Sequence, residues 1–349
     1  MRFGAFGDMV LLTILLRHLF ERFGQRVDVI SSGPWTAPLL EGQPGLGRLF
    51  VLRSRRTPYL FARDQWQLVS WLRERGAGPT WYCDRDLGIE LLHRGGIPNQ
   101  YICDARAFEW SPEQGFADRY IHLGNESPPA FAGLLPPPIP ASSRSAHLVV
   151  SDAARSDAEL WLTRRGLAGQ PYIVVHPGSR HIARRTIRSR AGAEKYWPED
   201  RWAHVLRSLS DLCPEAALIL TGTRAERKFN DAIIARAGVP RVFNAADELL
   251  VRTLLAVLER AHSVISVDTG PAHAAAALGT RTVALFGPAS TTLFRPGGAT
   301  TPAVTVSGVI YGTQSILAVT PEAVMAAWLQ LVRSAEVPSG HSVKSLSSD

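Results

Sequence analysis

The sequence predicts an α/β protein built from two nucleotide-binding-like domains, and three observations lead to this. Strand-like and helix-like segments alternate along the chain, which is typical of parallel sheets covered by helices. A proline-rich segment divides two such series, and a chain of 349 residues is long enough for two domains. Residues that could carry chemistry follow candidate strands in both series. We therefore expect them to line a cleft between the domains.

The first domain is expected to span residues 1–150. Its candidate strands are residues 27–30, 49–52, 81–83 and 120–123, and its candidate helices are residues 10–20 and 68–75. Residues 3–8 resemble the exit of a strand, yet almost no strand precedes them. Either that strand is minimal or the natural start lies upstream, and we favour the second interpretation.

The second domain is expected to span residues 151–335, after four prolines within five residues at 136–140. Its candidate strands are residues 172–176, 217–221, 242–243, 263–267 and 282–286, and its candidate helices are residues 198–212, 225–237 and 249–261. We expect a last helix, residues 320–334, to pack back on the first domain. The serine-rich tail, residues 336–349, has no apolar period and is expected to be disordered.

Composition limits the classes of function. Hydrophobic residues make up 46% of the chain, as in a soluble protein with a large core. A net charge of +7 suits nucleic acid, anionic lipid or a phosphorylated substrate equally well. Cys83, Cys103 and Cys213 lie far apart, which argues against disulfides and a zinc site and favours a cytoplasmic protein. No apolar run reaches the roughly 20 residues that span a bilayer, and peripheral membrane contact remains open.

The most informative segment is residues 264–279, where a buried strand, a sharp turn and an alanine-rich helix follow one another. Asp268 and Thr269 end the strand, and Gly270 and Pro271 open the helix. The free N–H groups of such a helix start form a ready site for phosphate. His273, on the first turn, is either a buried core residue or a further phosphate ligand.

A second candidate anion site follows residues 172–176. Gly178 and Ser179 could offer N–H and hydroxyl donors there, although the same residues also suit an ordinary turn. Lys195 stands just ahead of the next helix, in a Lys-x-Trp-Pro pattern. Arg184 and Arg185, from the arginine-rich segment between them, are alternatives to Lys195 as a phosphate contact.

Two acidic residues also follow strand exits. Glu226, four residues after Gly222, is either a partner of the helix dipole or a ligand of a sugar hydroxyl. Asp8 comes just after Gly7 at the start of the first helix. Asp8 is either an N-terminal cap or a general base at the mouth of the sheet, and the two roles are compatible.

Taken in order, four blocks resemble glycosyltransferase family 9, the bacterial heptosyltransferases of lipopolysaccharide core synthesis. The blocks are Gly7-Asp8, His176-Pro-Gly-Ser179 with Lys195-x-Trp-Pro198, Gly222 with Glu226, and Asp268-Thr-Gly-Pro-Ala-His273 with Leu285-Phe-Gly-Pro288. The resemblance implies the GT-B fold, in which two Rossmann-like domains face each other across a cleft. It also implies an inverting transfer from ADP-heptose with neither a metal nor another cofactor.

By the same resemblance, Asp8 would take the proton of the acceptor hydroxyl, and Lys195 would meet the donor's phosphate or sugar. Thr269, Gly270 and His273 would hold the diphosphate, with Ser179 and Gly222 beside it. Asp268 and Glu226 would contact the sugar or order the site.

The acceptor would be a phosphorylated glycolipid bound by the first domain. Arg53, Arg55 and Arg56, followed by Trp66 and Trp71, mix cations with aromatic rings. These residues form either an ordinary amphipathic surface or a patch for an acidic glycolipid. The second role would also favour loose attachment to the cytoplasmic face of an anionic inner membrane.

Other functions remain as alternatives. A related enzyme could use a UDP or GDP sugar, and a sugar-nucleotide epimerase shares the two-domain architecture. Asp84-Arg-Asp86 matches the metal-binding triplet of a different glycosyltransferase fold, but one triplet is a weak signal. A nucleic-acid-binding protein would need a reading module, and the sequence contains none that we recognise; we therefore expect no nucleic-acid partner.

Overall fold

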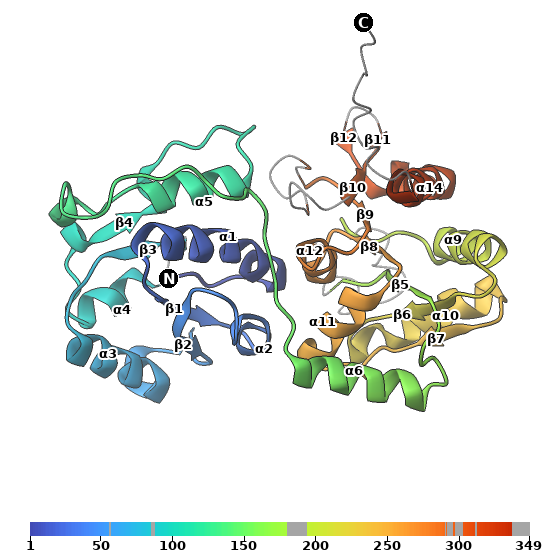
Figure 1. The fold of residues 1–349 in the computed structure, drawn as a ribbon, viewed down its shortest axis with the longest axis horizontal. Coiled ribbons are helices and arrows are strands. Elements are labelled where there is room, and N and C mark those ends of the chain that lie inside the picture. The colour runs from blue at the N-terminus through green and yellow to red at the C-terminus, as the bar shows by residue number, and fades with distance from the viewer. Residues whose placement is uncertain are drawn as a thin grey trace, which may run out of the picture.

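The computed structural model describes residues 1–55, 57–84, 88–179, 194–289, 291, 296, 303–310 and 313–336. Two α/β halves lie side by side and are joined by a long extended connector (Figure 1). The prediction of a mixed α/β fold with parallel strands is confirmed.

The N-terminal half contains two pairs of parallel strands. Its strands are β1 (Val27–Ser32), β2 (Leu46–Leu52), β3 (Thr80–Tyr82) and β4 (Ile102–Asp104), with β1 paired to β2 and β3 paired to β4. Its helices are α1 (Phe6–Phe23), α2 (Thr36–Leu40), α3 (Arg63–Arg75), α4 (Ile89–Arg94) and α5 (Phe116–Asn125).

The first residues of the chain run between these two strand pairs. Arg2 N donates to Ile30 O of β1 at 3.0 Å, and Cys83 N donates to Met1 O at 2.9 Å. Met1 and Arg2 therefore use the backbone groups that a strand at this position would use. The chain then turns directly into α1, which places Asp8 at the end of the sheet where the parallel strands finish.

The C-terminal half has one parallel six-stranded sheet in the order β10-β9-β8-β5-β6-β7. The strands are β5 (Tyr172–His176), β6 (Ala217–Leu220), β7 (Val242–Asn244), β8 (Ser263–Val267), β9 (Thr282–Leu285) and β10 (Ala303–Val306). The strand order reverses between β5 and β8. In open α/β sheets, ligands bind at the carboxyl ends of the strands at such a switch point.

Helices cover both faces of this sheet, and a small hairpin lies near its β10 edge (Figure 1). The helices are α6 (Asp152–Arg164), α9 (Glu199–Leu212), α10 (Arg227–Ala237), α11 (Val251–Arg260), α12 (Gly270–Ala277) and α14 (Pro321–Glu336). The hairpin pairs β11 (Val309–Ile310) with β12 (Thr313–Gln314).

The two halves share part of their hydrophobic core. Helix α1 packs against α12, and buried Leu15 and Leu16 belong to the same cluster as Ala274 and Ala275. The alanines of α12 carry little side-chain volume, so they allow α1 to approach closely. This packing sets the start of α1 against the start of α12.

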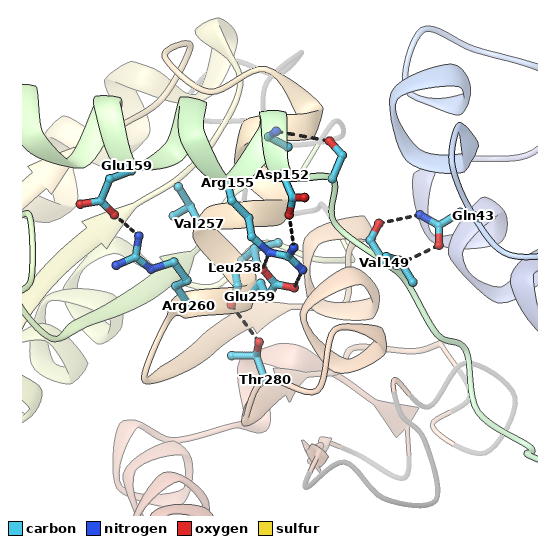
Figure 2. A network of polar contacts seen from close by, with 12 residues as sticks. Gln43, Val149, Asp152, Arg155, Glu159, Val257, Leu258, Glu259, Arg260 and Thr280 are labelled. Atoms are coloured by element: carbon cyan, nitrogen blue, oxygen red, sulfur yellow. Dashed lines mark hydrogen bonds and ion pairs between the residues drawn. The ribbon is translucent and has the colours of Figure 1, made fainter.

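The connector is held on both sides. Gln43 Nε2 donates to Val149 O at 2.9 Å, and Val149 N donates to Gln43 Oε1 at 2.8 Å (Figure 2). Ser151 then caps α6, and Arg155 bonds Glu259 of α11 (Figure 2). The chain thus leaves the N-terminal half at Val149 and joins the C-terminal half almost at once.

Two expectations about secondary structure and packing are wrong. Residues 120–123 form part of helix α5, in which buried Tyr120 and Leu123 are three positions apart, as on one face of a helix. A short apolar run does not separate strand from helix by periodicity alone. The helix expected at residues 320–334 is present as α14, but it packs on α9, β9 and β10 of its own half instead of returning to the N-terminal half.

The position of α14 has a clear physical reason. Its apolar stripe, which includes Met325 and Trp328, is buried in the same cluster as Trp202 of α9. Trp328 Nε1 also donates to Ser263 Oγ of β8 at 2.8 Å. Most of the expected tail, residues 337–349, lies outside the described residues. In the part of the chain that the structure describes, no helix has the length and apolar character needed to cross a membrane.

Candidate active site at the meeting of two helix starts

Asp8 lies in the first turn of α1, and its carboxylate has two partners. Oδ2 accepts from Ala5 N at 2.7 Å, and Oδ1 accepts from Arg2 Nη2 at 2.9 Å. The Asp8 side chain is 23% exposed. The helix start and the guanidinium both stabilise negative charge on this carboxylate. Because each oxygen accepts from one partner among the described residues, each keeps a lone pair for another donor.

Arg2 is a residue of this site that the sequence analysis did not single out. Besides Asp8, it donates from Nη1 to Cys83 O at 2.6 Å, which ties it to the end of β3. Its side chain is only 13% exposed. No sequence pattern identifies it, because its partner depends on the fold of the loop between residues 2 and 8.

On the opposite side, the exit of β8 carries the start of α12. Thr269 is the N-cap residue, with extended backbone, and Pro271 stands within the first helical positions. Thr269 Oγ1 donates to Val267 O at 3.1 Å, which fixes the turn. Gly270 opens the helix, where the backbone N–H has no acceptor within the helix. The geometry is that of an anion site at a helix N-terminus.

Asp268 connects two of the predicted donor-side residues. Lys195 Nζ donates to Asp268 Oδ2 at 2.7 Å and to Asp268 O at 2.5 Å. His273 Nε2 lies 3.4 Å from Asp268 Oδ1. Burial alone would raise the pKa of Asp268, but bonding to His273 and the charge of Lys195 outweigh it and hold the pKa below its usual value. Asp268 is therefore an anion that orients a cation and an imidazole beside the start of α12.

The exits of β5 and β6 bring Gly178 and Gly222 to one carboxylate. A Cβ on Gly178 would lie 2.6 Å from Oε1 of Glu226, and one on Gly222 would lie 3.2 Å from Glu226 Cβ. Glu226 is buried and accepts from Thr223 N at 2.6 Å and Thr223 Oγ1 at 2.8 Å. A side chain at Gly178 would displace the Glu226 carboxylate, and one at Gly222 would crowd it.

Several buried polar atoms lack a hydrogen-bond partner among the described residues. Two of them, Ser179 Oγ and His273 Nδ1, belong to the expected donor side. Buried polar groups are normally hydrogen-bonded. Both atoms belong to residues expected to bind the donor, and both are available to the oxygens of a bound anion.

The two sides of the site touch each other. A Cβ on Gly7 would lie 2.9 Å from His273 Cδ2, and a Cβ on Gly270 would lie 2.4 Å from Phe6 Cδ1. The residue before Asp8 therefore contacts the residue expected to hold phosphate. Asp8, next to Gly7 in α1, and Asp268, just before α12, therefore lie on opposite sides of this contact.

Of the three arginines expected to bind the acceptor, the structure describes Arg53 and Arg55. Arg55 stacks its guanidinium 5.3 Å from the centre of the Phe3 ring, close to the loop that carries Asp8. Arg53 is exposed at the end of β2. Arg56 lies outside the described residues, and so do Arg184 and Arg185 with the rest of their segment, and Arg85 and Asp86 of the acidic triplet. Asp84 accepts from Phe3 N at 2.7 Å.

We also searched the described residues for cavities and for groups of side chains that could hold a metal ion. A cavity of about 340 Å³ in the N-terminal half is lined by residues of α1, β1 and β3 and by Trp71 of the expected acceptor patch, but by neither Asp8 nor the expected donor-binding residues. Among the described residues, no group of three or more His, Cys, Asp or Glu side chains is arranged to hold a metal ion.

Two α/β halves with parallel strands, which meet at the starts of α1 and α12, define a protein of the GT-B fold. The chain belongs to glycosyltransferase family 9 (heptosyltransferase), whose model matches residues 127–316. It is therefore a glycosyltransferase.

The comparisons with individual proteins agree with this family. Lipopolysaccharide heptosyltransferase 2 of Salmonella typhimurium is 22% identical over 304 residues, which cover 81% of this chain and 80% of that protein. The structure of E. coli ADP-heptose lps heptosyltransferase II has a TM-score of 0.71 at 22% identity, covering 97% of this chain and 100% of the other. E. coli heptosyltransferase WaaC with ADP gives 0.64 at 16% identity, covering 95% and 100%.

Proposed function

We propose that this glycosyltransferase moves a heptose from ADP-heptose to a lipopolysaccharide core acceptor, with inversion and without a metal ion. The contact between Gly7 and His273 carries the proposal. It joins the first turn of α1, which carries Asp8, to the first turn of α12, where we expect the donor diphosphate to bind. The transfer needs the general base close enough to the diphosphate site for the acceptor hydroxyl to reach the anomeric carbon of the bound donor.

The donor diphosphate would lie at the start of α12. The N–H of Gly270, the unpartnered Nδ1 of His273 and the hydroxyl of Ser179 are donors for its oxygens. Lys195, held by Asp268, adds a full positive charge. Together these groups stabilise the charge that develops on ADP as it leaves, which is the role a metal ion has in other transferases.

Asp8 would act as the general base. The acceptor hydroxyl gives its proton to a carboxylate oxygen of Asp8 while its own oxygen forms a bond to the anomeric carbon. The bond from that carbon to the phosphate oxygen breaks, and ADP leaves with the electron pair. Attack from the face opposite the leaving group inverts the anomeric centre.

The other two carboxylates of the site are less suited to this role. Asp268 already bonds Lys195, and Glu226 is buried against Thr223. The Asp268 side chain is 7% exposed and Glu226 is 2% exposed, so both are less accessible to an acceptor hydroxyl than the Asp8 side chain, which is 23% exposed. We therefore assign Glu226 and Asp268 to ordering the site and contacting the donor sugar.

The relatives support the choice of donor and acceptor. One of the similar structures is a heptosyltransferase with ADP, and the curated relative is named for lipopolysaccharide. We infer that the acceptor is a phosphorylated glycolipid approached from the N-terminal half. An enzyme with such an acceptor would work at the cytoplasmic face of the inner membrane.

Calorimetric titration with ADP, UDP and GDP tests the donor. We expect ADP to bind most tightly, and Lys195→Met to weaken ADP binding about tenfold or more through loss of a charged contact. Lys228→Met, which removes an exposed lysine of α10, is the matched control. Tighter binding of UDP or GDP than of ADP would exclude ADP-heptose as the donor. Loss of transfer on adding EDTA would contradict metal independence.

A further inference from the structure

Large apolar side chains are exposed where the chain passes from β2 into α3. The short helical turn η1 (Tyr59–Phe61) leads into α3, and Leu60 is 72% exposed, Phe61 79% and Trp66 45%. We propose that these three residues form a membrane anchor that inserts into the interface of an anionic lipid bilayer. Neighbouring exposed large apolar side chains of this kind mark an interaction site.

The anchor belongs to an ordered loop. Gln65 is buried and donates from Nε2 to Ser54 O at 2.8 Å and to Thr57 O at 3.0 Å. Asp64 accepts from Arg53 N at 2.8 Å and from Ser54 N at 3.0 Å. Phe61 N donates to Pro58 O at 2.9 Å. The backbone is thus bonded inward, and Leu60 and Phe61 are held outward.

Charge complementarity identifies a bilayer as the occupant. Arg53 and Arg63 are exposed, and neither forms an ion pair within the described residues. Asp64, the nearest acid in sequence, is used by the loop backbone. Arginines beside an exposed apolar pair suit anionic headgroups above a hydrocarbon layer.

The aromatic residues of the anchor fit the same interpretation. Trp66 meets the Tyr59 ring edge-on with centroids 6.4 Å apart, and Arg94 stacks 4.5 Å from the centre of Tyr59. Tryptophan and tyrosine are enriched where a protein crosses from lipid to water. A second copy of this chain would bring its own arginines against these, and like charges disfavour such a dimer.

The anchor is close to the acceptor side of the site. The same loop carries Arg55, whose guanidinium lies over Phe3, and Phe3 precedes the turn that holds Asp8. Docking through Leu60 and Phe61 would bring Asp8 near the polar head of a lipid-linked acceptor. This step rests on the proposed function, whereas the binding to lipid does not.

Vesicle flotation with the full chain tests the anchor. The probes are vesicles of phosphatidylglycerol with phosphatidylethanolamine, and vesicles of phosphatidylcholine alone. We expect binding to the anionic vesicles, and a fall of at least tenfold in the double variant Leu60→Ser/Phe61→Ser. Leu250→Ser is the matched control, because Leu250 is 75% exposed in the C-terminal half. An unchanged ADP titration shows that the double variant is folded.

Three outcomes would overturn the proposal. The first is equal binding of wild type and double variant to anionic vesicles. The second is absence of wild-type binding. The third is a wild-type dimer in light scattering that the double variant dissociates, because the surface would then bind a second copy.

Transfer assays separate this proposal from the proposed function. We expect the double variant to transfer at the wild-type rate to a water-soluble acceptor without acyl chains. With the acylated acceptor in vesicles, we expect its transfer rate to fall at least tenfold. Equal rates on both acceptors for both proteins would contradict a role in acceptor access. Preference for UDP or GDP would refute the donor but leave the vesicle result standing.

Discussion

Gly7 and His273 are separated by most of the chain, yet a Cβ on Gly7 would lie 2.9 Å from Cδ2 of His273. Gly7 belongs to the first turn of α1 and His273 to the first turn of α12. The two helix starts therefore meet at a residue that has no side chain. Any added atom at Gly7 must displace the imidazole or move the halves apart.

Gly7→Ala is expected to lower kcat/KM for transfer by about 10- to 100-fold, because small displacements in a reacting geometry are costly. The helix itself should not weaken, since alanine is favoured over glycine within helices by about 0.5–1 kcal/mol. Steady-state kinetics with thermal unfolding measure both effects.

Gly78→Ala provides the control for that substitution. A Cβ on Gly78 would have no atom within 4 Å, and its backbone is not in the left-handed region. This variant should transfer at the wild-type rate. Wild-type kinetics for Gly7→Ala as well would show that the contact has no role in the site.

Asp8→Asn tests the general base. The amide keeps an oxygen that can accept from Ala5 N, so the first turn of α1 should persist. Loss of a general base typically costs about 10²- to 10⁴-fold in rate. We expect kcat to fall by this factor, with ADP affinity unchanged in calorimetry.

Asp118→Asn is the matched control, because Asp118 occupies the first turn of α5 as Asp8 does in α1. It should transfer normally. Turnover of Asp8→Asn near the wild-type level would refute the assignment of Asp8.

The strand ends and helix starts of the expected donor side could be predicted from sequence because their geometry is local. A buried strand, Asp268, a helix-opening Gly-Pro pair and a following strand occupy consecutive positions, and β8 and α12 form as expected. Gly222 and Glu226 are likewise joined by a short turn. Strand exit and helix start are encoded within a few residues of each other.

The contacts between distant segments could not be predicted in the same way. Lys195 and Asp268 are 73 positions apart, and Arg2 reaches Cys83 across 81 positions. These pairs depend on strand order and on how α1 packs against α12. The pattern of α14 likewise predicted a buried face, but its partner could only be read from the structure.

The stability of the second half should depend on pH through His176. Burial lowers the pKa of His176 below its ordinary 6.5, and the charge of Glu226 only partly opposes this. Above pH 6.5 the ring is neutral in both the folded and unfolded chains. Below pH 6.5 the unfolded chain takes up a proton that the folded chain resists, so stability falls until the folded pKa is reached.

We therefore expect the free energy of unfolding to decline by up to about 1.4 kcal/mol per pH unit below pH 6.5 on account of this one residue. His176→Gln should remove that part of the decline, because glutamine does not titrate and can still bond Thr221, which lies 3.0 Å from His176 Nδ1. Urea unfolding at pH 7.5 and pH 5.5 measures the difference. His204→Gln, at an exposed position of α9, should decline as the wild type does. An equal fall in the free energy of unfolding for wild type and His176→Gln would show that His176 is protonated as readily in the folded chain as in the unfolded one. Its burial near Thr221 and Glu226 would then have no effect on stability in acid.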